Sequence, residues 1–187
     1  MIHMVQNKNN IELDIILTLI KNKSHLREIA RTLNKSHSTI LRKINELVKE
    51  NVLDFKQEGK NKVFFIKNNL KAKNYVYSAE IYKLSNLLRK HPGLSIILEN
   101  TKKNTKKEMV ILFGSYAKGN PKPNSDIDIY IETINKNLKK EIENINSKIN
   151  IKIGNFDLSS LLIKEIIKNH IIIRGVEEFY EKTLFFE

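Results

Sequence analysis

The amino-acid sequence predicts an α+β protein made of two small folded parts that are joined by a helix. Residues 11–69 show helical spacing of apolar residues three times, followed by two short strand-like runs around a glycine. Residues 71–90 keep helical spacing over one long segment, which the His-Pro-Gly at 91–93 ends because proline cannot continue a helix. The runs beyond predict a mixed β-sheet flanked by helices. The expected boundaries are 1–70 for the first domain, 71–92 for the linking helix and 93–187 for the second domain.

The positive charge of the chain lies mainly in its first half. The 187 residues contain 33 Lys and Arg against 21 Asp and Glu, a formal net charge of +12. Residues 1–92 contain 18 basic and 8 acidic side chains, whereas residues 93–187 contain 15 and 13. This asymmetry indicates that the first half meets a polyanion while the second half has a different task.

Several classes of protein are excluded by what the sequence lacks. There is no cysteine, so a disulfide framework, a Cys-based zinc site and a thiol nucleophile are excluded, and the five histidines are too scattered for a His-based metal site. No apolar run approaches the ~20 residues that span a bilayer. The apolar stretch 13–20 carries Asp14 and has no cleavage signal of a secreted protein. We therefore expect a cytoplasmic protein that does not bind membranes.

Three short amphipathic helices are predicted first, because apolar residues recur at helical spacing over 11–20, 26–33 and 40–48. Serines precede the second and third helices as candidate N-caps: Ser24, and Ser36 or Ser38.

A β-hairpin is predicted after the third helix. Asn51 ends that helix, since Asn tolerates the left-handed conformation found at helix C-termini. The runs Val52–Lys56 and Lys62–Lys67 have strand character, and Gly59 lies in the turn between them. Three helices followed by a hairpin resemble the winged helix-turn-helix family over about the first 70 residues. The resemblance implies binding of double-stranded DNA.

The third helix and the hairpin carry the candidate DNA-binding residues. A helix fits the major groove, and its first turns point side chains at base edges. The candidates on the helix are His37, Ser38, Thr39, Arg42 and Lys43, and those offered to phosphates by the hairpin are Lys60 and Lys62. Two other interpretations are open: a solvated helix face beside an ordinary basic turn, and a module that binds another protein.

The long helix over 71–90 has an apolar stripe with two interpretations. It spans the two domains, or it pairs with the same helix of a second copy. We expect a homodimer, because dimeric regulators bind two DNA half-sites.

Two aspartates in the second domain are candidate metal ligands. The segment 125–131 alternates polar or aromatic residues with isoleucine, which predicts a strand with two different faces. Asp126 and Asp128 then point the same way, away from the isoleucines. Two such carboxylates hold Mg²⁺ when triphosphate oxygens and water complete its coordination.

A phosphate-binding turn is predicted shortly before these aspartates. The apolar run 110–113 predicts a buried strand that ends in Gly114-Ser115 at the start of a helical turn. Free backbone N–H groups there face an anion, and glycine lets the anion come close. The Ser115 hydroxyl adds a donor, and Lys118 adds positive charge.

Either pattern alone is common, but together they are specific. Gly-Ser followed eleven residues later by Asp-x-Asp, between apolar strands, resembles the minimal nucleotidyltransferase domains of the DNA polymerase β superfamily over about residues 93–187. The resemblance implies a mixed sheet flanked by helices, binding of a nucleoside triphosphate with Mg²⁺, and nucleotidyl transfer with pyrophosphate leaving. It assigns the triphosphate to Gly114 and Ser115, and the metal to Asp126 and Asp128.

The sequence departs from this family in one respect. Active members place a third carboxylate on a neighbouring strand, where it binds the catalytic metal and activates the attacking hydroxyl. The candidate strand, 149–153, has Asn150 and Lys152 on the relevant face. Asp157 follows the strand and is the candidate third ligand and catalytic residue, together with Asp126 and Asp128.

Two functions follow from these patterns. The first is a DNA-associated enzyme that transfers a nucleoside monophosphate to an unidentified acceptor hydroxyl. The second is a transcriptional regulator or antitoxin whose degenerate nucleotidyltransferase domain senses a nucleotide or holds a protein partner. The third carboxylate decides between them.

Overall fold

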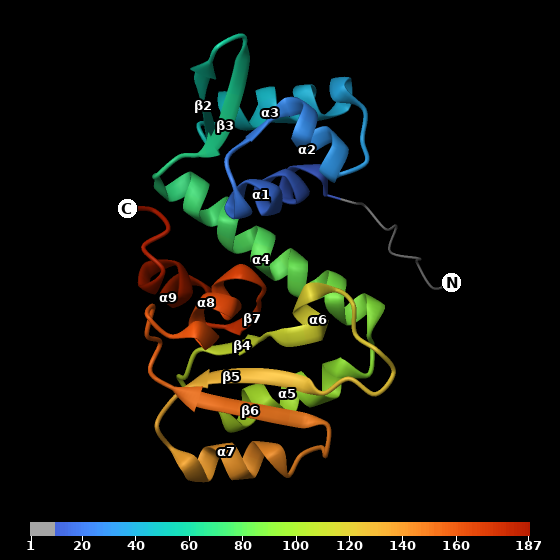
Figure 1. Ribbon diagram of the computed structural model, residues 1–187, viewed down its shortest axis with the longest axis vertical. Helices are drawn as coiled ribbons and strands as arrows, with labels where there is room; N and C mark the ends of the chain where they lie inside the picture. Colours follow the sequence, from blue (N-terminus) through green and yellow to red (C-terminus); the bar gives the residue numbers. More distant parts are fainter. Residues whose placement is uncertain (1–9) are drawn as a thin grey trace, which may run out of the picture. The chain divides into compact units, whose positions relative to one another are not determined.

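The computed structural model describes residues 10–187, and these residues divide into two compact units (Figure 1). Unit 1 ends at Ala79, and unit 2 comprises Glu80–Glu187. The boundary lies inside the long helix α4 (Leu70–Lys90), whereas the sequence-based boundaries treat this helix as a separate segment.

Unit 1 is a winged helix, as predicted. Its elements are α1 (Ile11–Lys21), β1 (Ser24–His25), α2 (Leu26–Thr32), α3 (His37–Lys49), β2 (Leu53–Glu58), β3 (Asn61–Ile66) and the first half of α4. The three strands form an antiparallel sheet in the order β1-β3-β2, in which β2 and β3 are joined by the two-residue turn Gly59-Lys60. The core contains fully buried isoleucines from three helices: Ile15, Ile16, Ile29, Ile40 and Ile44.

The helix ends of unit 1 confirm one predicted cap and correct another. Ser36 caps α3, because its Oγ accepts a hydrogen bond from the backbone N–H of Thr39 at 3.2 Å. The predicted cap at Ser24 is wrong. Ser24 lies in β1, where it pairs with Phe64 of β3, and its hydroxyl donates to Glu28. Asn51 ends α3 in the left-handed conformation, with φ of 63°.

Unit 2 is a four-stranded mixed sheet with helices on both faces. It contains the second half of α4 and α5 (Leu94–Asn104), β4 (Val110–Leu112), α6 (Gly114–Lys118), β5 (Ile127–Glu132), α7 (Lys136–Glu143), β6 (Ile149–Gly154), α8 (Leu161–Lys168), β7 (Ile171–Arg174) and α9 (Val176–Lys182). The strand order is β6-β5-β4-β7. β4 runs antiparallel to both of its neighbours, and β5 and β6 are parallel.

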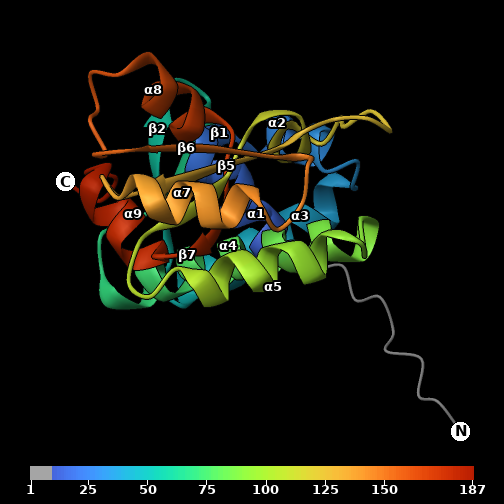
Figure 2. The ribbon, with the colours of Figure 1, turned by 90° about the horizontal axis from the view of Figure 1, so that it is seen from below.

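The two faces of this sheet differ in what covers them. Helices α5 and α7 lie side by side on one face, whereas α6 and α8 lie on the other (Figures 1 and 2). Alternation along β5 buries Ile127, Ile129 and Ile131 in a core that also includes Leu138 and Ile142 of α7. The intervening residues of β5 therefore belong to the face of α6 and α8.

Candidate functional site

Gly114 and Asp128 are brought together by the pairing of β4 with β5. The backbone N–H of Phe113, the residue after β4, donates to the carbonyl of Asp128 at 2.9 Å. Gly114 follows with φ of 68°, and a Cβ built on it would lie 2.2 Å from Oδ2 of Asp128. Only glycine leaves room for this carboxylate, and its positive φ also suits glycine. The predicted phosphate-binding turn and one predicted metal ligand are therefore in direct contact.

Asp126 lies immediately before β5, two residues from Asp128. Asp126 is exposed and Asp128 is half-buried. Their roles as metal ligands stay a prediction that suits this geometry, because residues two apart along a strand share a face. In residues 10–187 there is no group of three or more Asp, Glu or His side chains arranged to hold a metal ion. Mg²⁺ would thus fit here only if phosphate oxygens and water completed its coordination.

Asn150 occupies the position where the resemblance places a third carboxylate. Asn150 pairs in register with Asp128 across the parallel strands β5 and β6. Its Nδ2 donates a hydrogen bond to Oδ1 of Asp128 at 2.8 Å. A neutral amide therefore contacts the candidate metal ligand, and an amide cannot take a proton from an attacking hydroxyl.

The structure does not bring Asp157 to this site. Gly154, at the end of β6, pairs with Glu132 at the far end of β5. Since a strand rises about 3.3 Å per residue, Gly154 lies roughly 13 Å along the strand from Asn150. The backbone N–H of Phe156 donates to Glu132 at 3.3 Å, so Asp157, the next residue, also lies near that end of β5. The Asp157 carboxylate accepts hydrogen bonds from the Ser159 hydroxyl and backbone N–H, which lower its pKa. The Asp157 carboxylate therefore closes a turn, and within residues 10–187 it forms no metal-holding group with Asp126 and Asp128.

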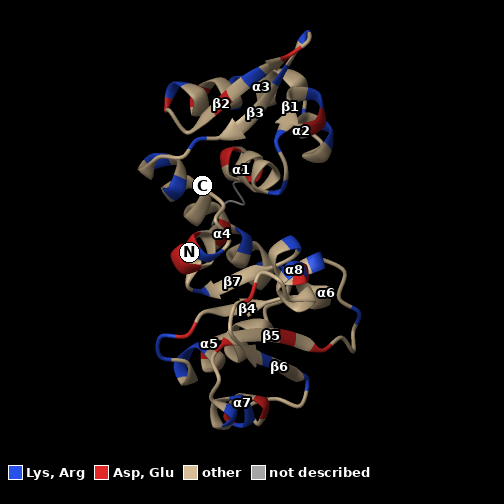
Figure 3. Ribbon diagram, turned by 60° about the vertical axis from the view of Figure 1, so that its left-hand side comes forward, with Lys and Arg blue, Asp and Glu red and all other residues tan. Residues whose placement is uncertain are grey.

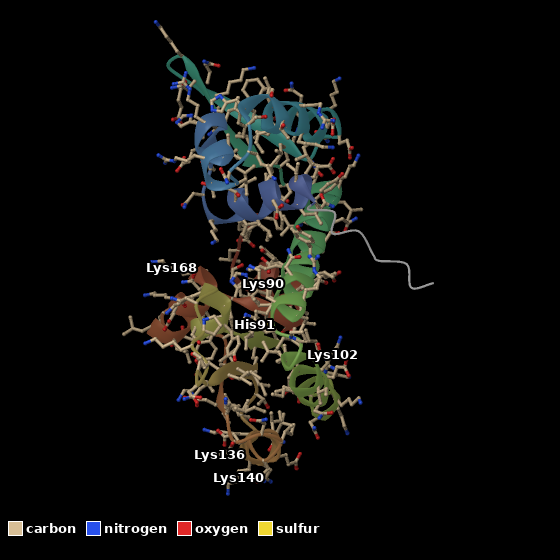
Figure 4. The ribbon with its side chains drawn as sticks, turned by 90° about the vertical axis from the view of Figure 1, so that its right-hand side faces the viewer. Lys90, His91, Lys102, Lys136, Lys140 and Lys168 are labelled. Carbon is tan, nitrogen blue, oxygen red and sulfur yellow. The ribbon has the colours of Figure 1, made fainter. Side chains whose placement is uncertain are left out.

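The other predicted nucleotide-binding residues lie on α6. Ser115 is half-buried directly after Gly114. Lys118 is exposed, and its ammonium lies 2.7 Å from Oε1 of Glu165 on α8, so it must leave this partner to meet a phosphate. The Tyr116 ring of α6 packs edge-on against the ring of His91, directly after α4 (Figure 4), with centroids 5.3 Å apart.

The predicted DNA-binding residues of α3 fall into two groups. His37, Ser38 and Arg42 are exposed, and 66% of the Arg42 side chain is accessible despite an ion pair with Glu46. Thr39 is half-buried, and its hydroxyl lies 2.8 Å from the Ser36 hydroxyl.

Lys43 differs from these residues. Its ammonium lies 2.8 Å from Glu12 of α1 and 2.6 Å from Glu46, and hydrogen bonds to these carboxylates raise its pKa. The structure therefore places Lys43 in a link between α1 and α3 and not on the exposed face of α3.

A basic groove beside α3 contains cations that sequence reasoning missed. The groove has a volume of about 760 Å³ and lies between α2, the start of α3 and β3. Six basic or imidazole side chains line it: His25, Arg27, Arg31, His37, Lys60 and Lys62. Its one acidic lining residue, Glu28, already accepts a hydrogen bond from Ser24.

The sequence feature that could have identified these cations is the helical spacing of two arginines. Arg27 and Arg31 are four residues apart and therefore lie on one face of α2. Figure 3 shows the positive charge on α2 and at the tip of the hairpin, where Lys60 is exposed. Lys62 lies over the Phe55 ring, 3.9 Å from its centroid.

Comparison with known proteins identifies the class of unit 2. Residues 96–178 match the family model described as polymerase beta, nucleotidyltransferase. Unit 2 is therefore a nucleotidyltransferase domain of the DNA polymerase β type, fused to the winged helix of unit 1. Domains of this family typically use a divalent metal. No curated protein matches the chain.

Two crystal structures have limited similarity to the chain. One is the adhesin competence repressor (AdcR) from Streptococcus pyogenes, with a TM-score of 0.41, 19% identity, and coverage of 48% of this chain and 68% of that chain. The other is a toxin-antitoxin with AMP-PNP, with a TM-score of 0.34, 23% identity, and coverage of 55% and 82%. None of the helices in residues 10–187 is long and apolar enough to span a membrane.

Proposed function

We propose that this protein is a winged-helix DNA-binding protein whose nucleotidyltransferase domain binds a nucleoside triphosphate with Mg²⁺ but does not transfer the nucleotidyl group to a hydroxyl. Asp126 and Asp128 hold the ion, and Gly114 and Ser115 hold the triphosphate. The ion neutralises phosphate charge when it is bound. The second domain then acts as a nucleotide-sensing part of a regulator.

The observation that carries this proposal is the hydrogen bond between Asn150 and Asp128. It places a neutral donor where a hydroxyl acceptor needs a base and a second metal ion needs a ligand. Transfer to a hydroxyl is the competing function, and the family match of residues 96–178 favours it. The contact between Asn150 and Asp128 favours binding without this transfer.

The nucleotide proposal is tested by binding and labelling together. Wild-type protein is expected to bind a nucleoside triphosphate only with Mg²⁺, and Asp128→Asn is expected to abolish that binding. With α-labelled triphosphate and cell extract, the wild type is expected to label no hydroxyl, whereas Asn150→Asp gains label because it restores a carboxylate. Asn155→Asp makes the same chemical change at an exposed position after β6 and serves as the control. Labelling of a hydroxyl by the wild type would contradict the proposal.

The basic groove and the exposed face of α3 support the DNA-binding part of the proposal. In this proposal Arg27 and Arg31, which line the groove, meet phosphates, and the exposed residues His37, Ser38 and Arg42 meet base edges. Binding to a duplex is expected to weaken steeply with salt, because each neutralised phosphate releases counterions. Two half-sites would need two copies of the chain, and homodimerisation stays a prediction.

The DNA-binding proposal has its own test. Arg31→Ala is expected to weaken duplex binding and to lower the salt dependence by about 0.9 in the log–log slope if Arg31 contacts one phosphate. Lys21→Ala removes an exposed cation at the end of α1, outside the groove, and is expected to have little effect. Affinity of the wild type that is insensitive to salt would refute phosphate binding by unit 1.

A further inference from the structure

The edge of the sheet beside the nucleotide site carries a positive charge that the proposed function does not use. β6 is an edge strand of unit 2, and Lys152 is exposed on it. Asn150 and Lys152 are two residues apart, so they share one face and their Cα atoms are about 7 Å apart. Among the ion pairs of residues 10–187, none involves Lys152.

The face of the sheet around Lys152 is accessible only on the side of Asp128. Lys152 pairs in register with Tyr130, whose side chain is buried and whose hydroxyl donates to the carbonyl of Gly154 at 2.8 Å. The Tyr130 side chain therefore covers the face of the sheet beyond Lys152. On β6 the accessible groups beside Asp128 are the amide of Asn150 and the ammonium of Lys152, and the exposed carboxylate of Asp126 lies two residues before Asp128.

Asp126 and Asp128 carry negative charge themselves, so this place suits an anion when Mg²⁺ neutralises them and the β6 side adds no further carboxylate. A third carboxylate would repel an anionic acceptor that approached the nucleotide. Asn150 has no charge, and after donating one hydrogen to Asp128 its amide has a second hydrogen to donate. The Lys152 ammonium adds an unpaired positive charge, so the two residues together favour an anionic oxygen where a carboxylate would exclude it.

The ionisation of the acceptor decides which chemistry is open to such a site. An alcohol must lose its proton when it attacks, and Asn150 cannot take that proton. A phosphate monoester has its second pKa near 6, so at neutral pH its oxygens are already ionised. Such an acceptor needs no base.

We propose that the Asn150–Lys152 side of unit 2 binds a phosphate monoester as the nucleotidyl acceptor, an inference that rests on the proposed binding of a nucleoside triphosphate. An oxygen of the monoester forms a bond to the α-phosphorus of the triphosphate. The bond from the α-phosphorus to the α,β-bridging oxygen breaks, and pyrophosphate leaves with the electron pair. No proton is transferred, and the product is a diphosphate that joins the nucleoside to the acceptor.

The first experiment measures anion binding without any turnover. Phenyl phosphate is titrated into the full chain with Mg²⁺ and without nucleotide, and binding is followed by calorimetry or by amide shifts of residues 149–154. Wild-type protein is expected to bind, and Lys152→Gln is expected to weaken binding about fivefold, the upper end for one exposed charge. Asn150→Asp is expected to weaken it as well, because it adds a negative charge. No binding by the wild type would overturn the inference.

A matched control separates a local effect from a general loss of charge. Lys140 is also exposed, but it lies on α7, which covers the opposite face of the sheet (Figures 2 and 4). Lys140→Gln removes the same charge and is expected to leave phenyl phosphate binding unchanged. Equal losses in Lys140→Gln and Lys152→Gln would overturn the inference.

The second experiment tests transfer. With α-labelled triphosphate and Mg²⁺, the wild type is expected to produce a labelled nucleoside phenyl diphosphate from phenyl phosphate and no labelled product from phenol. Absence of the diphosphate despite measurable triphosphate binding would overturn the acceptor role. Failure to bind triphosphate while phenyl phosphate still binds through Lys152 would refute the proposed function, and anion binding by β6 would stand by itself.

Discussion

Gly114 is the residue on which the geometry of the proposed nucleotide site depends most directly. Its backbone touches the Asp128 carboxylate, whose other oxygen accepts from Asn150. A side chain at position 114 would occupy the place of Oδ2, so the carboxylate would have to turn away from the candidate metal position. The absence of a side chain is thus as much a part of this site as the carboxylate.

Gly114→Ala is expected to weaken Mg²⁺-dependent triphosphate binding by about 10- to 100-fold, the range for displaced partners of metal ligands. Gly119→Ala is the matched control. Gly119 also has a positive φ, 78°, but nothing lies within 4 Å of the position that a Cβ would take there. Both substitutions are expected to cost about 1–2 kcal/mol of stability for the left-handed backbone. Equal nucleotide affinity in the two variants would contradict the proposed contact.

A second residue-scale feature is the buried carboxylate of Glu80. Its oxygens lie 3.0 Å from the Tyr180 hydroxyl, 3.3 Å from Nε2 of His170 and 3.2 Å from the Lys83 ammonium. Burial raises the pKa of Glu80, but the hydrogen bond from His170 and the positive charge of Lys83 outweigh it and lower the pKa to about 2. The ionised form is therefore the one that stabilises unit 2.

The pH dependence of stability follows from this lowered pKa. Because the pKa of Glu80 is about 2 when folded and 4.5 when unfolded, its contribution is fully present above pH 4.5 and is lost as the pH falls towards 2. Glu80→Gln is expected to lower the free energy of unfolding by about 3 kcal/mol at pH 7, and by progressively less below pH 4.5. Urea titrations at several pH values measure this, with Glu99→Gln, at an exposed position of α5, as the control. If the difference in free energy of unfolding between wild type and Glu80→Gln stays constant from pH 7 to 3, the stabilising role assigned to ionised Glu80 is refuted.

At the scale of elements, α3 carries one exposed cation and one cation that is paired with another helix. Arg42 and Lys43 are adjacent in sequence, so they point about 100° apart around the helix. One is exposed, and the other reaches the Glu12 carboxylate of α1. Both residues were predicted to bind DNA, because the sequence shows a cation but not what it faces.

Substitutions of Arg42 and of Lys43 are expected to have different effects on DNA binding and on stability. Arg42→Ala is expected to weaken duplex binding with little change in stability. Lys43→Ala is expected to cost about 1 kcal/mol of stability, since two ion pairs are lost, while the salt dependence of DNA binding is retained. Fluorescence anisotropy across salt concentrations and urea unfolding measure the two effects. The assignment fails if Lys43→Ala lowers the salt slope as much as Arg42→Ala.

At the scale of the whole molecule, each unit has a hydrophobic core of its own. Ile44 is fully buried in unit 1 and Ile129 is fully buried in unit 2. The +12 net charge of the chain is therefore distributed over two separately packed bodies that share the helix α4. We expect each unit to keep its own binding function when the other is weakened.

Core substitutions test this independence. Ile44→Ala and Ile129→Ala each remove a buried side chain, which typically costs about 2–5 kcal/mol. Ile44→Ala is expected to lower the melting transition of unit 1 and to leave triphosphate affinity unchanged. Ile129→Ala is expected to lower the melting transition of unit 2 and to leave DNA affinity unchanged. Differential scanning calorimetry resolves the transitions. A single transition that both variants shift equally would show that the units unfold together.

Much of the fold was determined by local patterns in the sequence. The apolar periodicities predicted α1, α3 and β5, because one face of each element must be buried whatever the partner. The family motif assigned Gly114 and Asp128 to one predicted site, but their contact was found only in the structure. Two-residue alternation also placed Asn150 on the correct face of β6.

Only the tertiary structure decided which of the candidate residues meet. The register of β5 with β6 sets Asn150 against Asp128 and places Asp157 at the far end of the sheet. The packing of α1 on α3 turns Lys43 inward, and the approach of β3 to α2 forms the basic groove with Arg27 and Arg31. These outcomes depend on contacts between residues far apart in the chain. Local periodicity specifies the face on which a side chain lies, but the neighbour that it finds there depends on how the elements pack.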